Sequence, residues 1–157
     1  MKPKAYLETS VISYLTSRPS RDLIVAANQQ LTQEWWQVRR QNFDLFISQL
    51  VIQEASAGDK DAAQRRLQAV VDIPLLKLSE EVVAFAEKLV EEGPMPQKAV
   101  EDALHIAVAT LNGMDYLLTW NFKHIANATM RYKIERMCRL AGYEPPIICT
   151  PQELLEE

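Results

Sequence analysis

Along this chain, short runs of apolar residues alternate with longer segments in which apolar residues recur every three or four positions. The short runs predict β-strands, and the wider spacing predicts amphipathic helices. The predicted strands cover 5–7, 44–48, 73–78, 116–119 and 147–149, and a helical segment follows each of them. Because parallel neighbours need long crossover connections, this alternation indicates a three-layer α/β/α fold with a central, mostly parallel sheet of about five strands.

Polar residues mark where several of the helices begin. A hydroxyl side chain can accept a hydrogen bond from the free N–H groups of a helix's first turn. We therefore expect Thr9 or Ser10 to cap the first helix, and Ser20 and Ser79 to cap two later ones. A further helix is predicted over 97–111, where two prolines give it a rigid entry.

The length and composition indicate one globular domain over residues 1–157. A chain of 157 residues can bury a complete core, and its 48% hydrophobic and 24% charged residues are typical of globular proteins. The longest apolar runs fall well short of the roughly 20 residues that span a bilayer. The N-terminal segment also lacks the apolar stretch of a signal peptide. We therefore expect a cytoplasmic protein without a membrane span.

The cysteines and the net charge narrow the functional classes. Cys138 and Cys149 have no CxxC spacing or nearby histidine-rich pattern, so we expect buried free thiols and no zinc site. A net charge of −4 argues against a protein that coats nucleic acid through bulk electrostatics. A nuclease remains compatible with this charge, because basic residues such as Arg18 and Lys123 could still contact phosphates. We expect His124, next to Lys123, to be exposed at the surface, with a phosphate contact as the alternative.

Polar residues with oxygen ligands lie near the ends of several predicted strands. Glu8 follows the first strand, Glu54 lies within about two helical turns of the second, and Asn121 follows the fourth. In parallel sheets, ligands gather outside the carboxyl ends of the strands. Asp102 lies early in the helix predicted over 97–111. Judged singly, each acid has an ordinary alternative, as a helix N-terminal charge or a solvated helix position.

Four segments, taken in order, resemble the PIN-domain family over essentially the whole chain. They are YLETSVISYL, VIQEAS, EDALHIAVA and LLTWNF, and the chain looks most like the VapC-type toxins of bacterial type II toxin–antitoxin pairs. That family has acidic residues after the first strand, in the following region, on the helix before the fourth strand and commonly after that strand. The matching positions here are Glu8, Glu54, Asp102 and Asn121.

The resemblance implies a metal-dependent endoribonuclease in which a metal-activated water attacks an RNA phosphodiester. Hard ions such as Mg²⁺ and Mn²⁺ prefer oxygen ligands. We therefore assign Glu8, Glu54 and Asp102 to the metal, directly or through water, and Asn121 to a weaker ligand or water-positioning role. Repulsion among the converging carboxylates should raise the pKa of at least one of them when no metal is bound.

Other residues around these positions receive supporting roles. Thr9, Ser10 and Thr119 could hold ligands or water at the site, although Ser10 is equally consistent with a simple cap. His105 is three residues after Asp102 and shares its helix face. The apolar IAVA segment after His105 favours a packed or supporting histidine over a catalytic one.

Two positions depart from the family pattern, and they keep an alternative open. The first acid is usually Asp but is Glu8 here, and Asn121 replaces an acid, which should weaken metal affinity or favour one ion over two. The alternative is therefore a PIN-like module that binds RNA or protein without cleaving. A different Mg²⁺-dependent phosphohydrolase is a third reading, but the chain has no GxxxxGK[ST] loop to support nucleotide turnover.

The resemblance also implies partners, namely a second copy in a homodimer and a cognate antitoxin whose C-terminal segment covers the site. Trp35 and Trp36 are adjacent on one helix and cannot both face the same way. Either one is core and the other lies flat against a neighbouring helix, or one reaches a partner surface. The residues do not distinguish RNA from DNA substrates, because the groups that would recognise a 2′-OH cannot be placed from sequence.

Overall fold

The computed structural model describes residues 1–155, and within this range five strands form one fully parallel sheet. The order across the sheet is β3-β2-β1-β4-β5. The strands are β1 (Lys4–Leu7), β2 (Asp44–Ser48), β3 (Leu75–Leu76), β4 (Tyr116–Leu118) and β5 (Ile147–Cys149). The predicted three-layer α/β/α architecture with a parallel sheet is confirmed.

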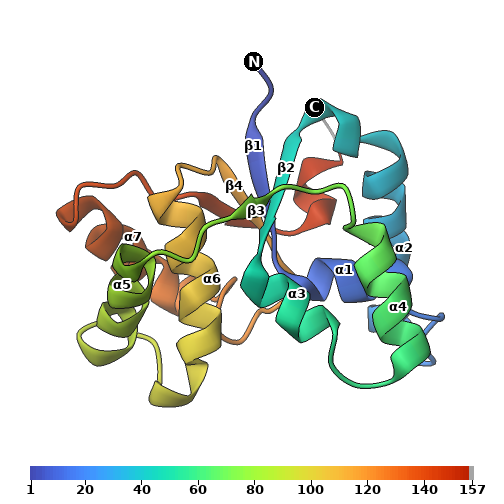
Figure 1. Ribbon diagram of the computed structural model, residues 1–157, viewed down its shortest axis with the longest axis horizontal. Coiled ribbons are helices and arrows are strands. Elements are labelled where there is room, and N and C mark those ends of the chain that lie inside the picture. The colour runs from blue at the N-terminus through green and yellow to red at the C-terminus, as the bar shows by residue number, and fades with distance from the viewer. Residues whose placement is uncertain (156–157) are drawn as a thin grey trace.

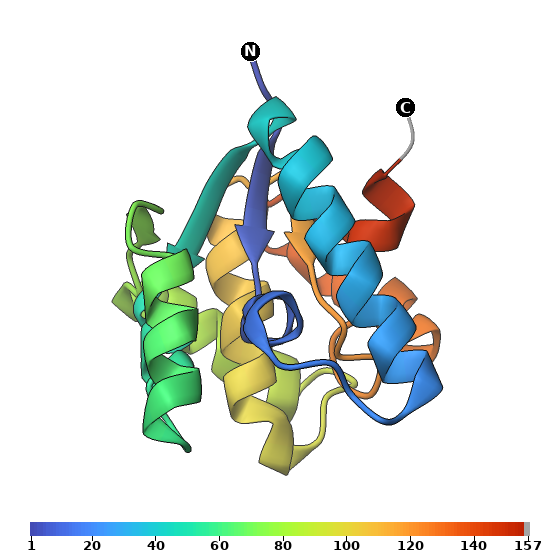
Figure 2. The same ribbon diagram turned by 90° about the vertical axis from the view of Figure 1, so that its right-hand side faces the viewer.

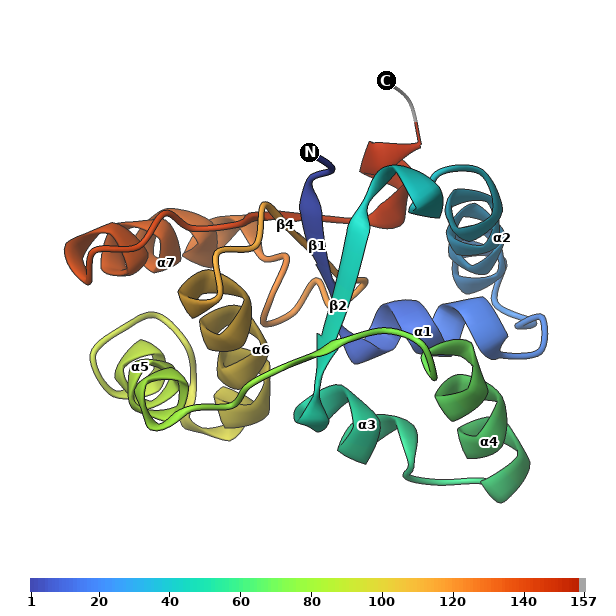
Figure 3. The ribbon, with the colours of Figure 1, turned by 45° about the horizontal axis from the view of Figure 1, so that its top comes forward.

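Helices cover both faces of this sheet (Figures 1 and 3). One side carries α5 (Glu80–Glu91), α6 (Val100–Leu111) and α7 (Ala128–Leu140), and the other carries α1 (Thr9–Thr16), α2 (Leu23–Val38) and α4 (Lys60–Ala69). The short helix α3 (Gln49–Ala55) continues directly from β2. Figure 2 shows β1 and β2 running in the same direction, with α1 beginning beyond the end of β1.

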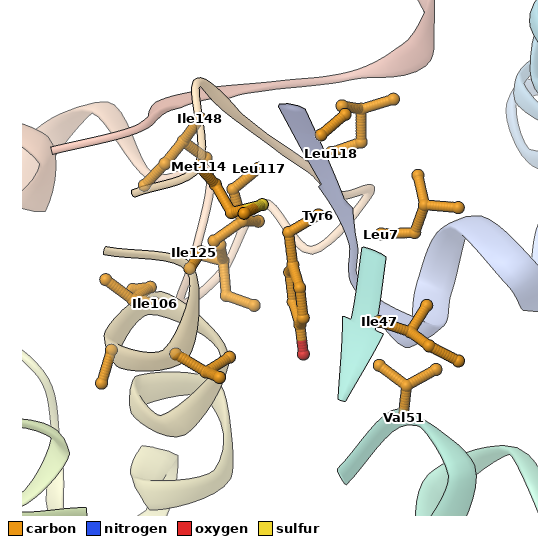
Figure 4. Close-up of a cluster of buried hydrophobic side chains, with 14 of the residues drawn as sticks. Tyr6, Leu7, Ile47, Val51, Ile106, Met114, Leu117, Leu118, Ile125 and Ile148 are labelled. Carbon is orange, nitrogen blue, oxygen red and sulfur yellow. The ribbon is translucent and has the colours of Figure 1, made fainter. Parts of the chain in front are cut away.

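The central strands are buried on both faces, so their side chains divide between two apolar layers. Tyr6 of β1 pairs in register with Leu117 of β4, and the next pair is Leu7 with Leu118. All four side chains are fully buried. Because successive strand residues point to opposite faces, Tyr6 and Leu117 lie on the α6 side, while Leu7 and Leu118 lie on the other (Figure 4). Tyr6 therefore brings a hydroxyl group into the layer between the sheet and α6.

The N-terminal caps of the first two helices differ from the prediction. Glu8 is the N-cap of α1, and its carboxylate accepts a hydrogen bond from the backbone N–H of Ser10. Asp22 caps α2 in place of Ser20, whose hydroxyl instead accepts a hydrogen bond from the Asp22 backbone. A carboxylate at these positions satisfies free N–H groups and also interacts favourably with the helix dipole. Ser79 caps α5 as predicted.

Three predicted elements differ in length or type. The third strand shrinks from 73–78 to the two residues of β3, and Pro74, which has no N–H to donate to a neighbouring strand, lies directly before it. The helix predicted over 97–111 begins as a 3-10 turn, η2 (Gln97–Ala99), before α6. The last predicted helix is also a 3-10 helix, η3 (Pro151–Leu154), and a third such turn, η1 (Arg40–Asn42), precedes β2.

The structure also resolves the two tryptophans and the two cysteines. Trp35 is fully buried, whereas Trp36 is partly buried and stacks under the guanidinium of Arg40, 3.8 Å from the ring centroid. Trp35 therefore belongs to the core, and an arginine covers Trp36. Cys138 and Cys149 are buried free thiols, as predicted, and burial raises the pKa of Cys149 to about 12.

Among residues 1–155, no helix is both long and apolar enough to cross a membrane.

A buried hydrogen bond ties the segment after β4 to α2. The indole Nε1 of Trp120 donates to the Thr32 hydroxyl oxygen at 2.8 Å, and that hydroxyl donates in turn to the Asn28 carbonyl. The Trp120 ring also stacks on Tyr14, with 5.7 Å between centroids. This bond holds the loop that continues to Asn121 against the helical layer.

Replacing Thr32 with Val keeps the shape of the side chain but leaves the Trp120 N–H without an acceptor. We expect Thr32→Val to lower the free energy of unfolding by about 1–3 kcal/mol, since a buried unpaired donor carries its desolvation penalty. Urea unfolding measures this loss. The same substitution made in a Trp120→Phe background should cost clearly less, and an equal cost in both backgrounds would show that the hydrogen bond is not its source.

Candidate metal centre

The sheet order brings three strand ends together at one edge. β1 lies at the centre, between β2 and β4. After β1 the chain adds β2 and β3 on one side of it, and then β4 and β5 on the other side. Glu8 follows β1 directly, Glu54 lies in α3 just beyond β2, and Thr119 follows β4. Such an edge, where the chain direction across the sheet reverses, is where parallel sheets hold their ligands.

Glu8 is 5% exposed, and its carboxylate accepts hydrogen bonds from the two segments beside it. The Thr119 hydroxyl donates to its Oε1 at 2.6 Å, and the Ser10 hydroxyl donates to the same oxygen. The backbone N–H of Ser10 donates to Oε2 at 3.1 Å. Ser10 also accepts from the Trp120 backbone N–H at 2.8 Å. These donors offset the desolvation of a buried carboxylate and fix its orientation.

Glu54 is held by a different pair of donors, and its side chain is 26% exposed. Its Oε1 accepts from the Thr9 hydroxyl and lies 2.8 Å from Nε2 of His105. Burial acts to raise the pKa of Glu54, but the hydrogen bonds and charge interactions around it, led by the one with His105, bring that pKa below its usual value. The predicted rise in the pKa of at least one carboxylate does not fall on Glu54, where hydrogen bonds and the charge interaction with His105 outweigh burial.

The chemistry of these groups fits a hard divalent cation. Glu8, Glu54 and His105 each offer a ligand atom, and these atoms lie within 4.8 Å of one another. Carboxylate oxygens suit Mg²⁺ and Mn²⁺, whereas imidazole is more typical of Zn²⁺, Cu²⁺ or Ni²⁺. The two carboxylates at the strand ends therefore fit the ions expected from the sequence.

Asp102, in the first turn of α6, faces the loop after β4. Its Oδ1 accepts from the Asn121 amide at 3.1 Å, and its Oδ2 lies 2.9 Å from Nδ1 of His124. The Asn121 side chain also accepts from the His124 backbone N–H. Of the described residues, the group within 4.8 Å does not include Asp102, so direct metal ligation by Asp102 stays a prediction.

The basic residues divide between the surface and structural roles. Arg18 and Lys123 are exposed, which leaves them free to contact a phosphate. His124 was expected on the surface, but its side chain is only 16% exposed because it is bonded to Asp102. Arg66 donates to the backbone carbonyls of Ala55 and Ala57 at 3.0 and 2.6 Å. Arg66 thus satisfies the end of α3, the helix that carries Glu54.

Several residues at this edge were not assigned a role at the site from the sequence. Tyr6 and Ser48 form buried hydrogen bonds that lead to His105. Glu101 adds a further carboxyl group beside the site and contributes to lowering the pKa of Glu54, after His105 and Thr9. The one available signal was Tyr6, a polar group within an apolar strand, because a buried hydroxyl requires a partner.

A comparison of the chain with protein-family models found a match. The family model of the PIN domain matches residues 5–127, a range that contains Glu8, Glu54, Asp102 and Asn121. The match therefore covers the three strand ends and the loop after β4. A comparison with curated proteins found no match.

Asn121→Asp should make the metal-free protein less stable and its metal binding tighter. The change removes the amide donor to Asp102 and places a second carboxylate beside it, so we expect a loss of about 1–2 kcal/mol without metal. The added ligand charge should raise Mn²⁺ affinity about tenfold. Thermal unfolding in EDTA and calorimetric Mn²⁺ titration measure the two effects.

Asn42→Asp is the matched control for this pair of measurements. Asn42 is exposed in η1, before the start of β2 and therefore at the opposite edge of the sheet, where the same added charge should leave Mn²⁺ affinity unchanged. An unchanged affinity in Asn121→Asp as well would place residue 121 outside the ion's ligand sphere.

Proposed function

Because the chain belongs to the PIN-domain family, whose members are generally metal-dependent nucleases, we propose that it is a Mg²⁺- or Mn²⁺-dependent endoribonuclease. The observation that supports this most strongly is the convergence of Glu8, at the end of β1, and Glu54, in the helix α3 that follows β2. Their ligand atoms, with that of His105, lie within 4.8 Å of one another. Carboxylates held at this spacing provide oxygen ligands for a single hard cation.

The side chains around the two carboxylates have separate tasks in this proposal. Glu8 and Glu54 hold the ion, and Asp102 contributes at its side or through a water. When bound, the ion acts as a Lewis acid that lowers the pKa of water and neutralises phosphate charge. Thr9 fixes Glu54, while Ser10 and Thr119 fix Glu8, so the protein itself orients the ligands.

The loop after β4 orients the third acid and faces the substrate side. The Asn121 side-chain N–H donates to Asp102, and the Asn121 side-chain oxygen accepts from the backbone N–H of His124. Lys123 of the same loop is exposed, and Arg18 is exposed beyond the C-terminal end of α1. Both can supply positive charge to an RNA backbone. The preference for RNA itself is carried by the resemblance to VapC-type proteins.

We further propose that the protein is the toxin of a bacterial type II toxin–antitoxin pair and acts as a homodimer. The similarity of its four acidic-site segments to VapC-type toxins supports this role. A cognate antitoxin would then restrain the nuclease by covering the acidic edge of the sheet. The cytoplasm, where its RNA substrates are found, is the expected place of action.

A module that binds RNA without cleaving it is the alternative, and Asn121 is the observation that favours it. An amide stands where the family commonly has an acid, and its N–H is already used on Asp102. Such a site can bind an ion yet hold it too weakly for turnover.

Metal binding and RNA cleavage together test the nuclease. We expect wild-type protein to bind Mn²⁺ in calorimetry, to melt at a higher temperature when saturated with Mn²⁺, and to cut a fluorogenic RNA in Mn²⁺ but not in EDTA. Glu54→Gln should lower Mn²⁺ affinity at least about tenfold and abolish cleavage, because it removes a ligand charge. Glu87→Gln, at an exposed position of α5, is the control and should behave as wild type.

Three results separate the readings. Cleavage of RNA but not of the matched DNA supports the endoribonuclease. Mn²⁺ binding without cleavage of either favours the binding module. A folded wild type that binds no Mn²⁺ contradicts metal-dependent catalysis.

The toxin role makes a separate prediction in living cells. Expression of the wild type in a bacterial host should stop growth, and Asp102→Asn should restore it, because Asp102 belongs to the acidic site. The control Asp72→Asn, at an exposed position before β3, should remain toxic. If growth still stops when Asp102→Asn is expressed at the same level, the toxicity does not depend on this site.

A further inference from the structure

A buried chain of hydrogen bonds leads from the sheet to Glu54. The Ser48 hydroxyl lies 2.8 Å from the Tyr6 hydroxyl, and the Tyr6 hydroxyl lies 2.7 Å from Nδ1 of His105. His105 Nε2 then lies 2.8 Å from Glu54 Oε1. Figure 4 shows the Tyr6 side chain extending from β1 with its oxygen directed away from the strand. Four residues from β1, β2, α3 and α6 are thus linked in one line.

The donors at Glu54 fix the direction of the last bond in this chain. Oε1 of Glu54 already accepts from the Thr9 hydroxyl, so this oxygen acts as an acceptor. The bond to His105 therefore needs a proton on Nε2. Whether the other ring nitrogen, Nδ1, also carries a proton depends on its contact with Tyr6.

Counting the hydroxyl protons decides that second nitrogen. If Nδ1 accepts from Tyr6, the Tyr6 oxygen can accept from Ser48, and every proton in the chain has an acceptor. If Nδ1 were protonated, Tyr6 would have to donate to Ser48, and the Ser48 proton would have no acceptor among its hydrogen bonds within residues 1–155. Buried polar groups are nearly always paired, so the neutral ring with its proton on Nε2 fits the structure best.

We propose that His105 is a positioning residue, a neutral imidazole that holds Glu54 for the metal through Nε2–H and is not itself a metal ligand. The proposal rests on the function proposed above, in which Glu54 binds the ion. Two donors, Thr9 and His105, converge on Oε1 of Glu54, which leaves Oε2 as the less engaged oxygen.

The surroundings of His105 suit this role better than ligation. The ring is fully buried, with the Tyr6 ring centroid 5.8 Å away, so it cannot turn freely. To ligate an ion through Nε2, His105 would have to lose its proton there and its bond to Glu54. Hydrogen-bond partners that orient ligands typically account for 10–100-fold in metal affinity, which sets the scale of the expected effect.

The tautomer can be read directly in the metal-free protein. Nitrogen-15 NMR of the imidazole rings needs to separate only two histidines, and a His124→Gln variant assigns them. We expect His105 to carry its proton on Nε2, to leave Nδ1 unprotonated, and to keep this pattern when Mg²⁺ is added to saturation. A proton on Nδ1 without metal, or loss of the Nε2 proton on addition of Mg²⁺, would overturn the proposal.

Tyr6→Phe tests whether the chain reaches the metal site. The substitution keeps the ring in the core but removes the donor to Nδ1 of His105. Because Tyr6 acts through His105, we expect Mn²⁺ affinity to fall roughly tenfold in calorimetry, the lower end of that range. Tyr116→Phe, at a partly buried position of β4, is the matched control and should keep wild-type affinity.

The outcomes separate this proposal from the function on which it rests. Mn²⁺ binding by wild type with no loss in a folded Tyr6→Phe variant overturns the positioning role alone. Absence of Mn²⁺ binding in the wild type overturns the proposed function, and the positioning role with it.

Discussion

The buried charge of Glu8 is the constraint on which the rest of the site depends. A carboxylate that is almost out of contact with water must be surrounded by donors, and here the donors come from α1 and from the end of β4. Ser10 supplies two of them from α1, and Thr119 supplies the third from the end of β4. The hydrogen bonds that satisfy the charge of Glu8 therefore connect the ends of the first and fourth strands, at the edge of the sheet where Glu54 also lies.

The carboxylates at this edge are each held by hydrogen-bond partners from the protein itself. Repulsion between carboxylates was the effect expected from sequence, yet each acid has its own donors: Thr9 and His105 at Glu54, and Asn121 with His124 at Asp102. The pKa of Glu54 falls below its usual value as a result, despite the opposing effect of burial. The site is organised by neutral and hydrogen-bonding groups, and a metal would add to an order already present.

The fold could be predicted from the chain, because the alternation of strand and helix patterns determines a parallel sheet with helices on both sides. The order of the acidic segments also indicated which residues approach the same edge. What the pattern could not give is which oxygen meets which donor. That depends on side-chain geometry across more than a hundred residues, as between Glu8 and Thr119, and sequence spacing along one helix says nothing about it. For the same reason His124 was expected at the surface, although it bonds Asp102.

The distance along the chain between the groups that hold Glu8 has a consequence for the protein's synthesis. Thr119 is made 111 positions after Glu8, and β4 must pair beside β1 before the two can meet. Contacts of such long range form late in folding, since a large loop must close first. A chain still emerging from the ribosome therefore lacks an assembled acidic edge, and the ability to bind a cation there arrives only with the nearly complete sheet.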